Sequence, residues 1–150
     1  MCRPNPHARA LKSSATGAIG YLVPSLRNPV NSPIIRGACD RAWRRGFVVM
    51  IAEDAGAVAP REAYDRMVEQ RRIDGLLIHS ARAGVDFYRH FDDGHFPAVF
   101  IDRAHEVPGR NVTMRDDDAG ALAARYLLGL GHRDLAHLTG TGDLDTVARR

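Results

Sequence analysis

The amino-acid sequence predicts an α/β fold built on a doubly wound parallel sheet. Short apolar runs alternate along the chain with segments whose apolar residues recur at helical spacing. The runs end in turn residues, and the run at 47–52 is nearly all apolar, as a strand covered on both faces must be. This rhythm is typical of parallel strands joined by right-handed helical crossovers.

The first strand–helix–strand cycle follows from this pattern. Residues 18–23 form a short apolar run that Pro24 stops, which predicts a buried strand followed by a loop. A helix is expected over 31–45, with Gly46 as its C-terminal stop, and a second strand over 47–52. The residues expected on the inner face of this helix share helical spacing: Ile34, Ile35, Ala38, Cys39, Ala42 and Trp43.

Later cycles repeat the pattern with weaker signals. A polar helix with Met67 on its inner edge comes first, and the strands after it are again short and apolar. Asp117 or Asp118 is expected to cap a further helix, because aspartate is a preferred N-cap. The expected elements are a helix at 60–72, a strand at 76–78, a short helix around 85–91, strands at 97–101 and 111–114, a helix to about residue 130, a strand at 135–140 and a helix start after Thr146.

Length and composition suit one domain with a sizeable core. The chain has 150 residues and a formal net charge of +3, and Lys12 is its only lysine, so arginine supplies almost all of its positive charge. A small excess of positive charge is compatible with binding to nucleic acid, but equally with an arginine-rich surface that is exposed to solvent. The sequence shows neither an apolar run of membrane-spanning length nor a secretory signal, so a cytoplasmic protein is expected.

The sequence lacks the common cofactor and catalytic motifs. It contains neither GxGxxG nor GxxxxGK[ST], and its serines lack a GxSxG surround. Cys2 and Cys39 have no metal-ligand spacing, and the seven histidines form no HExxH-type pair. The acidic run at 116–118 is compatible with a cation-binding site, but it better fits the N-terminus of a helix, where negative charges interact favourably with the helix dipole. We therefore expect no enzyme activity, no cofactor and no metal site.

Polar residues follow several of the predicted strands. In an open parallel sheet, the loops that leave the carboxyl ends of the strands form the ligand crevice, so the loop at 24–32 should line a site. His79 and Ser80 follow the third predicted strand, and Asp102 and Arg103 follow the fourth. The alternative is that these loops only join strands to helices.

A short helix is predicted at the start of the chain. Asn5 is a preferred N-cap and Pro6 suits the first helical position, which predicts a helix over 6–13. So short a helix is marginal in water unless something packs on it. The alternative is an ordinary disordered N-terminal tail.

Several segments, taken in their order and spacing, carry a resemblance to a known family. They are PNPHARAL, TGAIGYLVPSLRNP, RG at 36–37, RRIDGLLI, PAVFIDR, DDDAGALAARYLLGLGHRDLAHLTG and DLDTVARR. In these segments the chain resembles the lactose/galactose repressor (LacI/GalR) family of bacterial transcription regulators. The resemblance implies a hinge helix and linker at 1–15. It implies at 16–150 the N-terminal lobe of a type I periplasmic-binding-protein-like effector domain with the first strand of the C-terminal lobe, so the helix-turn-helix module and most of the second lobe are expected to be missing.

The resemblance also implies roles for individual residues. In a dimer, paired hinge helices would enter the DNA minor groove, with Leu11 wedged between base pairs and Ala8 allowing close approach. The hinge residues assigned to DNA binding are Asn5, Ala8, Arg9 and Leu11. The residues assigned to effector binding are Asn28, Val30, Ser32, Asp54, His79, Ser80, Asp102 and Arg103. Val30 departs from the family pattern, which often has an aromatic ring there for stacking on a sugar.

The expected function is part of a ligand-responsive, DNA-binding transcription regulator that acts as a repressor. Its effector would be a sugar or a similar small polar molecule, and effector binding would control the ordering of the hinge helix on operator DNA. The implied partners are operator DNA, the effector and a second copy of the chain in a homodimer, with no membrane. A periplasmic-type sugar-binding protein and a nonfunctional truncated gene product are the alternatives.

Overall fold

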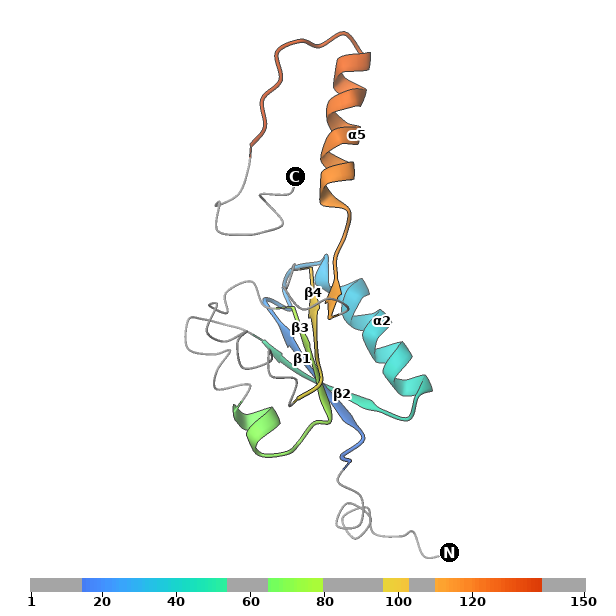
Figure 1. Cartoon of the computed structure of the whole chain (residues 1–150), viewed down its shortest axis with the longest axis vertical. Helices are drawn as coiled ribbons and strands as arrows, with labels where there is room; N and C mark the ends of the chain where they lie inside the picture. Colours follow the sequence, from blue (N-terminus) through green and yellow to red (C-terminus); the bar gives the residue numbers. More distant parts are fainter. Residues whose placement is uncertain (1–14, 54–64, 80–95, 103–109, 139–150) are drawn as a thin grey trace, which may run out of the picture. The chain divides into compact units, whose positions relative to one another are not determined.

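The computed structural model describes residues 15–53, 65–79, 96–102 and 110–138 (Figure 1). The chain divides into two compact units, Met1–Val99 and Phe100–Arg150, and each is described by itself. No helix within the described ranges is long and apolar enough to cross a membrane. The predicted hinge at 1–15 falls almost entirely outside the described residues.

A parallel sheet with strand order β2-β1-β3-β4-β5 organises the chain, which confirms the predicted fold class. Because β1 lies between β2 and β3, the chain must cross over the sheet between consecutive strands, as the alternating pattern predicted. The strands are β1 (Ala18–Val23), β2 (Val48–Glu53), β3 (Gly75–Ile78), β4 (Ala98–Ile101) and β5 (Asn111–Val112).

The central strand β1 carries the core of the first unit. Tyr21, Leu22 and Val23 have no exposed surface. On the opposite face from Tyr21, Gly20 lies under the side chains of Ile73 and Leu76, and a Cβ atom at Gly20 would come within 2.7 Å of Ile73 Cδ1. Glycine therefore suits this position because of the close packing of its neighbours, and a larger residue would force the ends of these side chains to shift.

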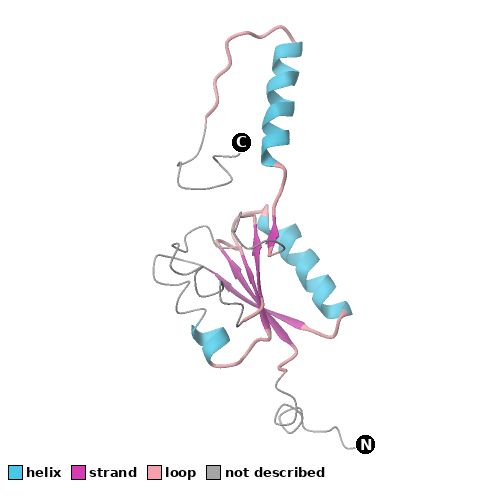
Figure 2. Ribbon diagram, viewed as in Figure 1, coloured by secondary structure: helices cyan, strands magenta, loops and turns pink. Residues whose placement is uncertain are grey.

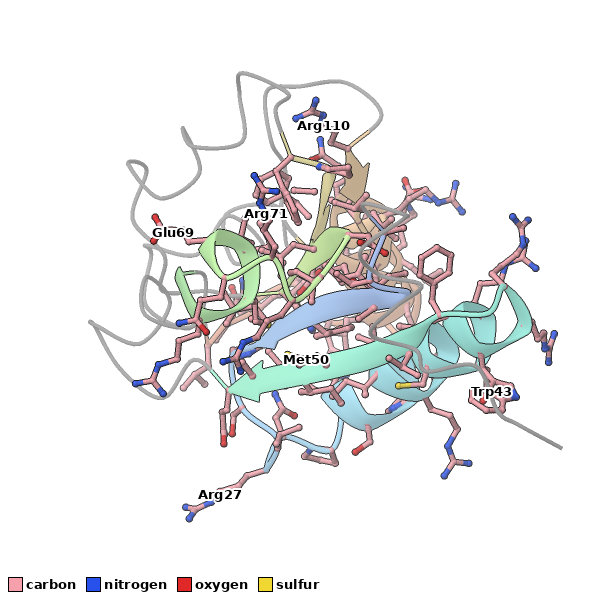
Figure 3. All side chains as sticks on the ribbon, turned by 90° about the horizontal axis from the view of Figure 1, so that it is seen from below. Arg27, Trp43, Met50, Glu69, Arg71 and Arg110 are labelled. Atoms are coloured by element: carbon pink, nitrogen blue, oxygen red, sulfur yellow. The ribbon has the colours of Figure 1, made fainter. Side chains whose placement is uncertain are left out.

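Helix α2 (Asn31–Arg44) flanks the sheet on the side opposite the short helix η1 (Figure 2). Gly46, with φ of +81°, takes the left-handed conformation that commonly ends a helix. Ala42 is buried as predicted, but Trp43 is 76% exposed, so its predicted place on the inner face is wrong (Figure 3). A helix buries only the narrow arc that contacts its neighbour, and Trp43 lies at the border of the apolar stripe.

Strand β2 differs from its prediction because it lies at the edge of the sheet. Its apolar run implied cover on both faces, but Val48, Met50 and Ile51 are exposed. Edge strands have a hydrogen-bonded neighbour on one side only, and β2 pairs with β1 alone among the described strands.

One turn of π-helix, η1 (Asp65–Glu69), is the described part of the helix predicted at 60–72. Met67 is buried as expected, and its sulfur lies near Gly20 on the side of β1 opposite Tyr21. Residues 60–64 and the short helix predicted around 85–91 lie outside the described residues.

At its amino end, β1 is tied to the turn before β3 by one carboxylate. Asp74 Oδ1 accepts hydrogen bonds from Thr16 N (2.7 Å) and Thr16 Oγ1 (3.0 Å), and Asp74 Oδ2 accepts one from Gly17 N (2.7 Å). Partial burial alone would raise the pKa of Asp74, but these hydrogen bonds outweigh it and hold the pKa below its usual value. The carboxylate therefore stays ionised and fixes the start of β1.

The second unit contains β5 and α5 (Asp116–Gly129). Three aspartates occupy the first turn of α5, as the acidic run predicted, but Arg115 rather than an aspartate is the N-cap, and no side-chain capping bond forms there. The strand predicted at 135–140 is wrong for 135–138, which form no strand, and Leu138 is 97% exposed. A strand needs a neighbour for its backbone hydrogen bonds, and none of the described residues pairs with this segment.

Candidate functional site

The loop after β1 is folded by its own hydrogen bonds. Ser25 Oγ accepts a hydrogen bond from Arg27 N (3.2 Å), and Asn28 Oδ1 accepts one from Val30 N (3.1 Å). The carbonyl oxygen of Asn28 accepts a further bond from Asn31 N (3.0 Å). These contacts shape the loop before any ligand is present, and the Arg27 side chain extends away from the sheet (Figure 3).

Asn31, at the first position of α2, is a site residue that the sequence analysis did not single out. Its side chain is buried, and its Nδ2 donates a hydrogen bond of 2.6 Å to the Ser25 carbonyl oxygen. The α2 N-cap, Val30, makes no side-chain capping bond to the described residues, so Asn31 rather than a cap connects the loop to the helix. The available signal in the sequence was its place in the segment 24–32, which was expected to line a site.

Glu53, on the neighbouring strand β2, forms a hydrogen bond with the loop that follows β1. It is the last residue of β2, and its Oε1 accepts a hydrogen bond of 3.0 Å from Leu26 N. The sequence predicts the end of a strand here, but no motif marks a role for this carboxylate. Its negative charge therefore lies at the carboxyl edge of the sheet, beside the loop that follows β1.

His79 follows β3 and is buried at the same edge. Its backbone N donates to the Leu22 carbonyl oxygen (2.8 Å), and its Nδ1 lies 3.2 Å from the Tyr21 hydroxyl. The two rings meet edge to face, with centroids 6.3 Å apart. Burial raises the pKa of Tyr21 to about 12, with a smaller contribution from Cys39. His79 is therefore held by its backbone and by its ring.

Asp102, which follows β4, has an unusual backbone and side chain. Its φ of +58° lies in the left-handed region that residues other than glycine rarely adopt. Its backbone N donates to the Val112 carbonyl oxygen (2.8 Å), whereas its buried Oδ1 has no hydrogen-bond partner in the structure described. Strained residues with unsatisfied polar atoms are often found at functional sites.

The predicted effector residues divide into those the structure describes and those it does not. Around β1 and β3, Asn28 is exposed at the loop, Val30 is 60% exposed, Ser32 is exposed in the first turn of α2, and His79 is buried. Because β1 and β3 are neighbouring parallel strands, these residues share one edge of the sheet. The predicted residues outside the described ranges are Asp54, Ser80 and Arg103 from the effector set and Asn5, Ala8, Arg9 and Leu11 from the hinge.

The chemistry of this edge is that of hydrogen bonding to a small polar molecule. It holds the exposed Asn28 amide, the Glu53 carboxylate and the exposed Ser32 hydroxyl, with the buried His79 imidazole at the same edge, and groups of these kinds can donate to and accept from hydroxyl-rich ligands. Within the described ranges, no group of three or more histidine, cysteine, aspartate or glutamate side chains is placed to hold a metal ion.

Comparisons with known proteins identify the family that the chain resembles in sequence and fold. A family model described as "Periplasmic binding proteins and sugar binding domain of LacI family" matches residues 16–150. The HTH-type transcriptional repressor PurR of Edwardsiella ictaluri is 29% identical over 150 residues, covering 98% of this chain and 44% of the relative. PurR of Vibrio atlanticus is 30% identical over 148 residues, covering 97% and 43%. The chain thus spans less than half the length of these relatives.

A solved structure shows the same fold with a ligand. The Cra transcriptional dual regulator of Pseudomonas putida, in complex with fructose 1-phosphate, superposes with a TM-score of 0.78 at 28% identity. The match covers 90% of this chain and 51% of that one.

Proposed function

Because the chain belongs to the family of periplasmic binding proteins and sugar-binding domains of LacI-type regulators, we propose that it is part of a transcriptional repressor whose activity a small molecule controls. The proposed effector is a sugar or a similar small polar molecule. The proposed partners are operator DNA and a second copy of the chain in a homodimer. The role is one of binding and signalling, with no reaction catalysed.

The observation that supports this proposal is the set of polar residues at the carboxyl ends of three neighbouring strands. Asn28 follows β1, Glu53 ends β2 and His79 follows β3. In open α/β sheets, ligands bind outside this edge. The loop there is already shaped by internal hydrogen bonds, so binding would require little further ordering.

Asp102, in the second unit, has by itself two features expected of a ligand-binding residue. A carboxylate oxygen that is buried without a hydrogen-bond partner in the described structure is an acceptor available to a ligand hydroxyl. The resemblance assigns Asp102 to effector binding, and backbone conformations like that of Asp102 occur preferentially at functional sites.

The proposed output is the ordering of the hinge helix at 6–13 on operator DNA. A helix of this length is marginal alone, so DNA and the partner hinge must stabilise it. An effector that changes the separation of the two hinges would therefore change operator affinity. The structure describes none of these hinge residues, and the contact of Leu11 with DNA is part of the proposal.

The proposal is tested with the full-length protein and the DNA upstream of its own gene. Gel shifts at physiological salt are expected to show sequence-selective binding that one member of a panel of sugars and sugar phosphates, including D-fructose 1-phosphate, changes at least tenfold. Unchanged binding with every member, together with no heat of binding by calorimetry, would contradict the proposed effector class.

Two reciprocal variants separate the two halves of the proposal. Leu11→Ala should weaken operator binding by roughly tenfold, about 1.4 kcal/mol, and leave effector affinity intact. His79→Gln should weaken effector affinity and leave operator affinity without effector unchanged. If Leu11→Ala lowers both affinities equally, the hinge assignment is wrong.

A periplasmic-type sugar-binding protein is the second candidate, because the matching family model also describes periplasmic binding proteins. The named relatives, in contrast, are repressors. Cell fractionation of the full-length product distinguishes the two, since recovery in the periplasm together with failure to bind DNA would favour the second candidate.

A further inference from the structure

The amino ends of β1, β2 and β3 lie at one edge of the sheet, because the three strands are parallel and β1 lies between the other two. Val48 N donates a hydrogen bond to the Gly17 carbonyl oxygen (2.9 Å), and Asp74 N donates one to the Ala18 carbonyl oxygen (2.8 Å). We call the residues that precede the three strands, 15–17, 44–47 and 69–74, the amino edge. The chain therefore enters β1 from the predicted hinge at the middle of the amino edge.

Two pairs of arginines lie at the amino edge, one on each side of β1. Arg44 and Arg45 precede β2, Arg71 and Arg72 precede β3, and each pair ends three residues before the first residue of its strand. All four residues are exposed, and their side chains form no ion pair or hydrogen bond with the residues that the structure describes. Four guanidinium groups are thus presented to solvent around the start of β1.

The backbone of these arginines is held in place by hydrogen bonds. Arg45 N donates to the Ala42 carbonyl oxygen (2.9 Å), and Arg72 N donates to the Met67 carbonyl oxygen (2.9 Å). Arg71, with φ of +50°, has a left-handed conformation that glycine would adopt at lower cost. The fold therefore fixes where the four charges start, while the long side chains extend into solvent.

The positive charge of the amino edge is not balanced by its acidic residues. The four arginines outnumber Asp74 and Glu69, the two acidic residues of these segments, and Glu69 forms no ion pair with the described residues. An alternative reason for Arg44 is its place in the last turn of α2, where cations interact favourably with the helix dipole. This reason does not extend to the pair before β3, because η1 is a single turn with a small dipole.

We propose that the amino edge binds the phosphate backbone of operator DNA through Arg44, Arg45, Arg71 and Arg72. This inference rests on the proposed function, in which the hinge at 6–13 lies in the minor groove. The four Cα steps from residue 13 to Gly17 span at most about 14 Å, so the amino edge would lie close to the phosphates beside that groove. Guanidinium groups suit this role because they bind phosphate oxygens with two parallel N–H bonds.

Contacts of this kind add affinity without reading the base sequence. Each phosphate that a protein neutralises adds about 0.9 to the slope of log affinity against log salt concentration. Phosphate contacts strengthen binding to the operator and to other duplexes alike, whereas base contacts determine which duplex is preferred. The amino edge would therefore raise the affinity and the salt dependence of DNA binding and leave sequence preference unchanged.

The test is operator binding by the full-length protein, followed by fluorescence anisotropy from about 50 mM to about 200 mM salt. Arg72→Gln should reduce the salt slope by about 1 to 2, because a homodimer loses two phosphate contacts. It should weaken binding to the operator and to a scrambled duplex by the same factor. Arg36→Gln is the matched control, since it removes the same charge from an exposed position in the first half of α2, nearer the opposite edge, and should leave the slope unchanged.

Two results would overturn the proposal. Equal salt slopes for Arg72→Gln and Arg36→Gln would show that only net charge matters, and a loss confined to the operator would indicate a base contact. Circular dichroism confirms that both variants are folded.

Failure of the proposed function would be seen separately. It fails if the unmodified protein prefers no duplex over another. The same two variants, measured on a mixed-sequence duplex at low salt, then decide the role of the amino edge. A slope reduced only in Arg72→Gln would support phosphate binding there, and an unchanged slope would overturn it.

Discussion

The two ends of β1 are held in different ways. At the amino end, the single carboxylate of Asp74 accepts three hydrogen bonds from Thr16 and Gly17. At the carboxyl end, the bonds are distributed over the loop itself, the buried Asn31 amide, Glu53 and the His79 backbone. Backbone hydrogen bonds from Val48 N to the Gly17 carbonyl oxygen and from Asp74 N to the Ala18 carbonyl oxygen also hold the amino end. Among the described side chains, the amino end therefore depends on one charged residue, whereas the carboxyl end is held by several weaker contacts.

This difference suits the positions of the two ends in the chain. The amino end directly follows the predicted hinge, and if the hinge prediction is correct, these charge-assisted hydrogen bonds would fix the point where the hinge joins the sheet. At the carboxyl end, side chains including Asn28 form hydrogen bonds with backbone groups of the loop, and the exposed side chain of Ser32 lies beside this preformed loop. We expect substitutions at the two ends to differ in how much they lower the free energy of unfolding and in how that loss depends on pH.

Gly20→Ala, between the two ends, should have the largest effect. The added methyl group would come within 2.8 Å of both Ile73 Cδ1 and Leu76 Cδ1, so the core must shift, at a cost of about 1–3 kcal/mol. Urea unfolding followed by circular dichroism measures this cost. Gly37→Ala is the matched control in α2, where nothing lies within 4 Å, and it should stabilise by about 0.5–1 kcal/mol. Equal effects of the two variants would contradict the packing described for β1.

Asn31→Ala tests the carboxyl end and should cost about 1–2 kcal/mol. It removes a buried donor and leaves the Ser25 carbonyl oxygen without that bond. The same unfolding assay applies. Ser32→Ala, at the next and exposed position, should change stability by less than about 0.5 kcal/mol. A loss as large in Ser32→Ala would show that the loop is not held through Asn31.

Asp74→Asn tests the amino end, with an expected loss of about 1 kcal/mol at pH 7, because the tie is only partly buried. Since the pKa of Asp74 is lowered in the folded chain, the tie stabilises fully above the unfolded pKa of about 3.9 and is lost as pH falls below it.

The pH dependence of unfolding separates this tie from ordinary surface charge. Between pH 5 and pH 3, the unmodified chain should lose more stability than Asp74→Asn. Asp40→Asn, an exposed position on α2 without hydrogen bonds to the described residues, should retain the full pH dependence. Parallel pH profiles for the unmodified chain and Asp74→Asn would refute the charged tie.

Elements with strong local signals were predicted well from the sequence. The strand expected at 18–23 matches β1, and the helix expected at 31–45 ends one residue earlier as α2. A proline, a glycine and a continuous apolar run fix these boundaries locally. The predicted burial of Trp43 and of the β2 side chains was wrong, because exposure depends on which neighbours cover an element, and apolar spacing does not report this.

The sequence predicted the position of the candidate site at one edge of the sheet, but it did not predict the contacts of the individual residues. Strand ends and loops placed Asn28 and His79 at one edge, which the described strands share. The roles of Tyr21, Asn31 and Glu53 depend on contacts between residues distant in sequence, such as Glu53 with Leu26, and no spacing along the chain encodes them. The assignments at Asp54, Ser80 and Arg103 stay predictions.

The fluorescence of the exposed Trp43 can be used to probe the surface around the end of α2. It is the only tryptophan, and with 76% of its side chain exposed, its fluorescence should resemble that of indole in water even in the folded state. Unfolding would therefore change the emission little, whereas any molecule that covers the end of α2 would move it to shorter wavelength. Emission spectra over a dilution series thus reveal association of this surface without any label.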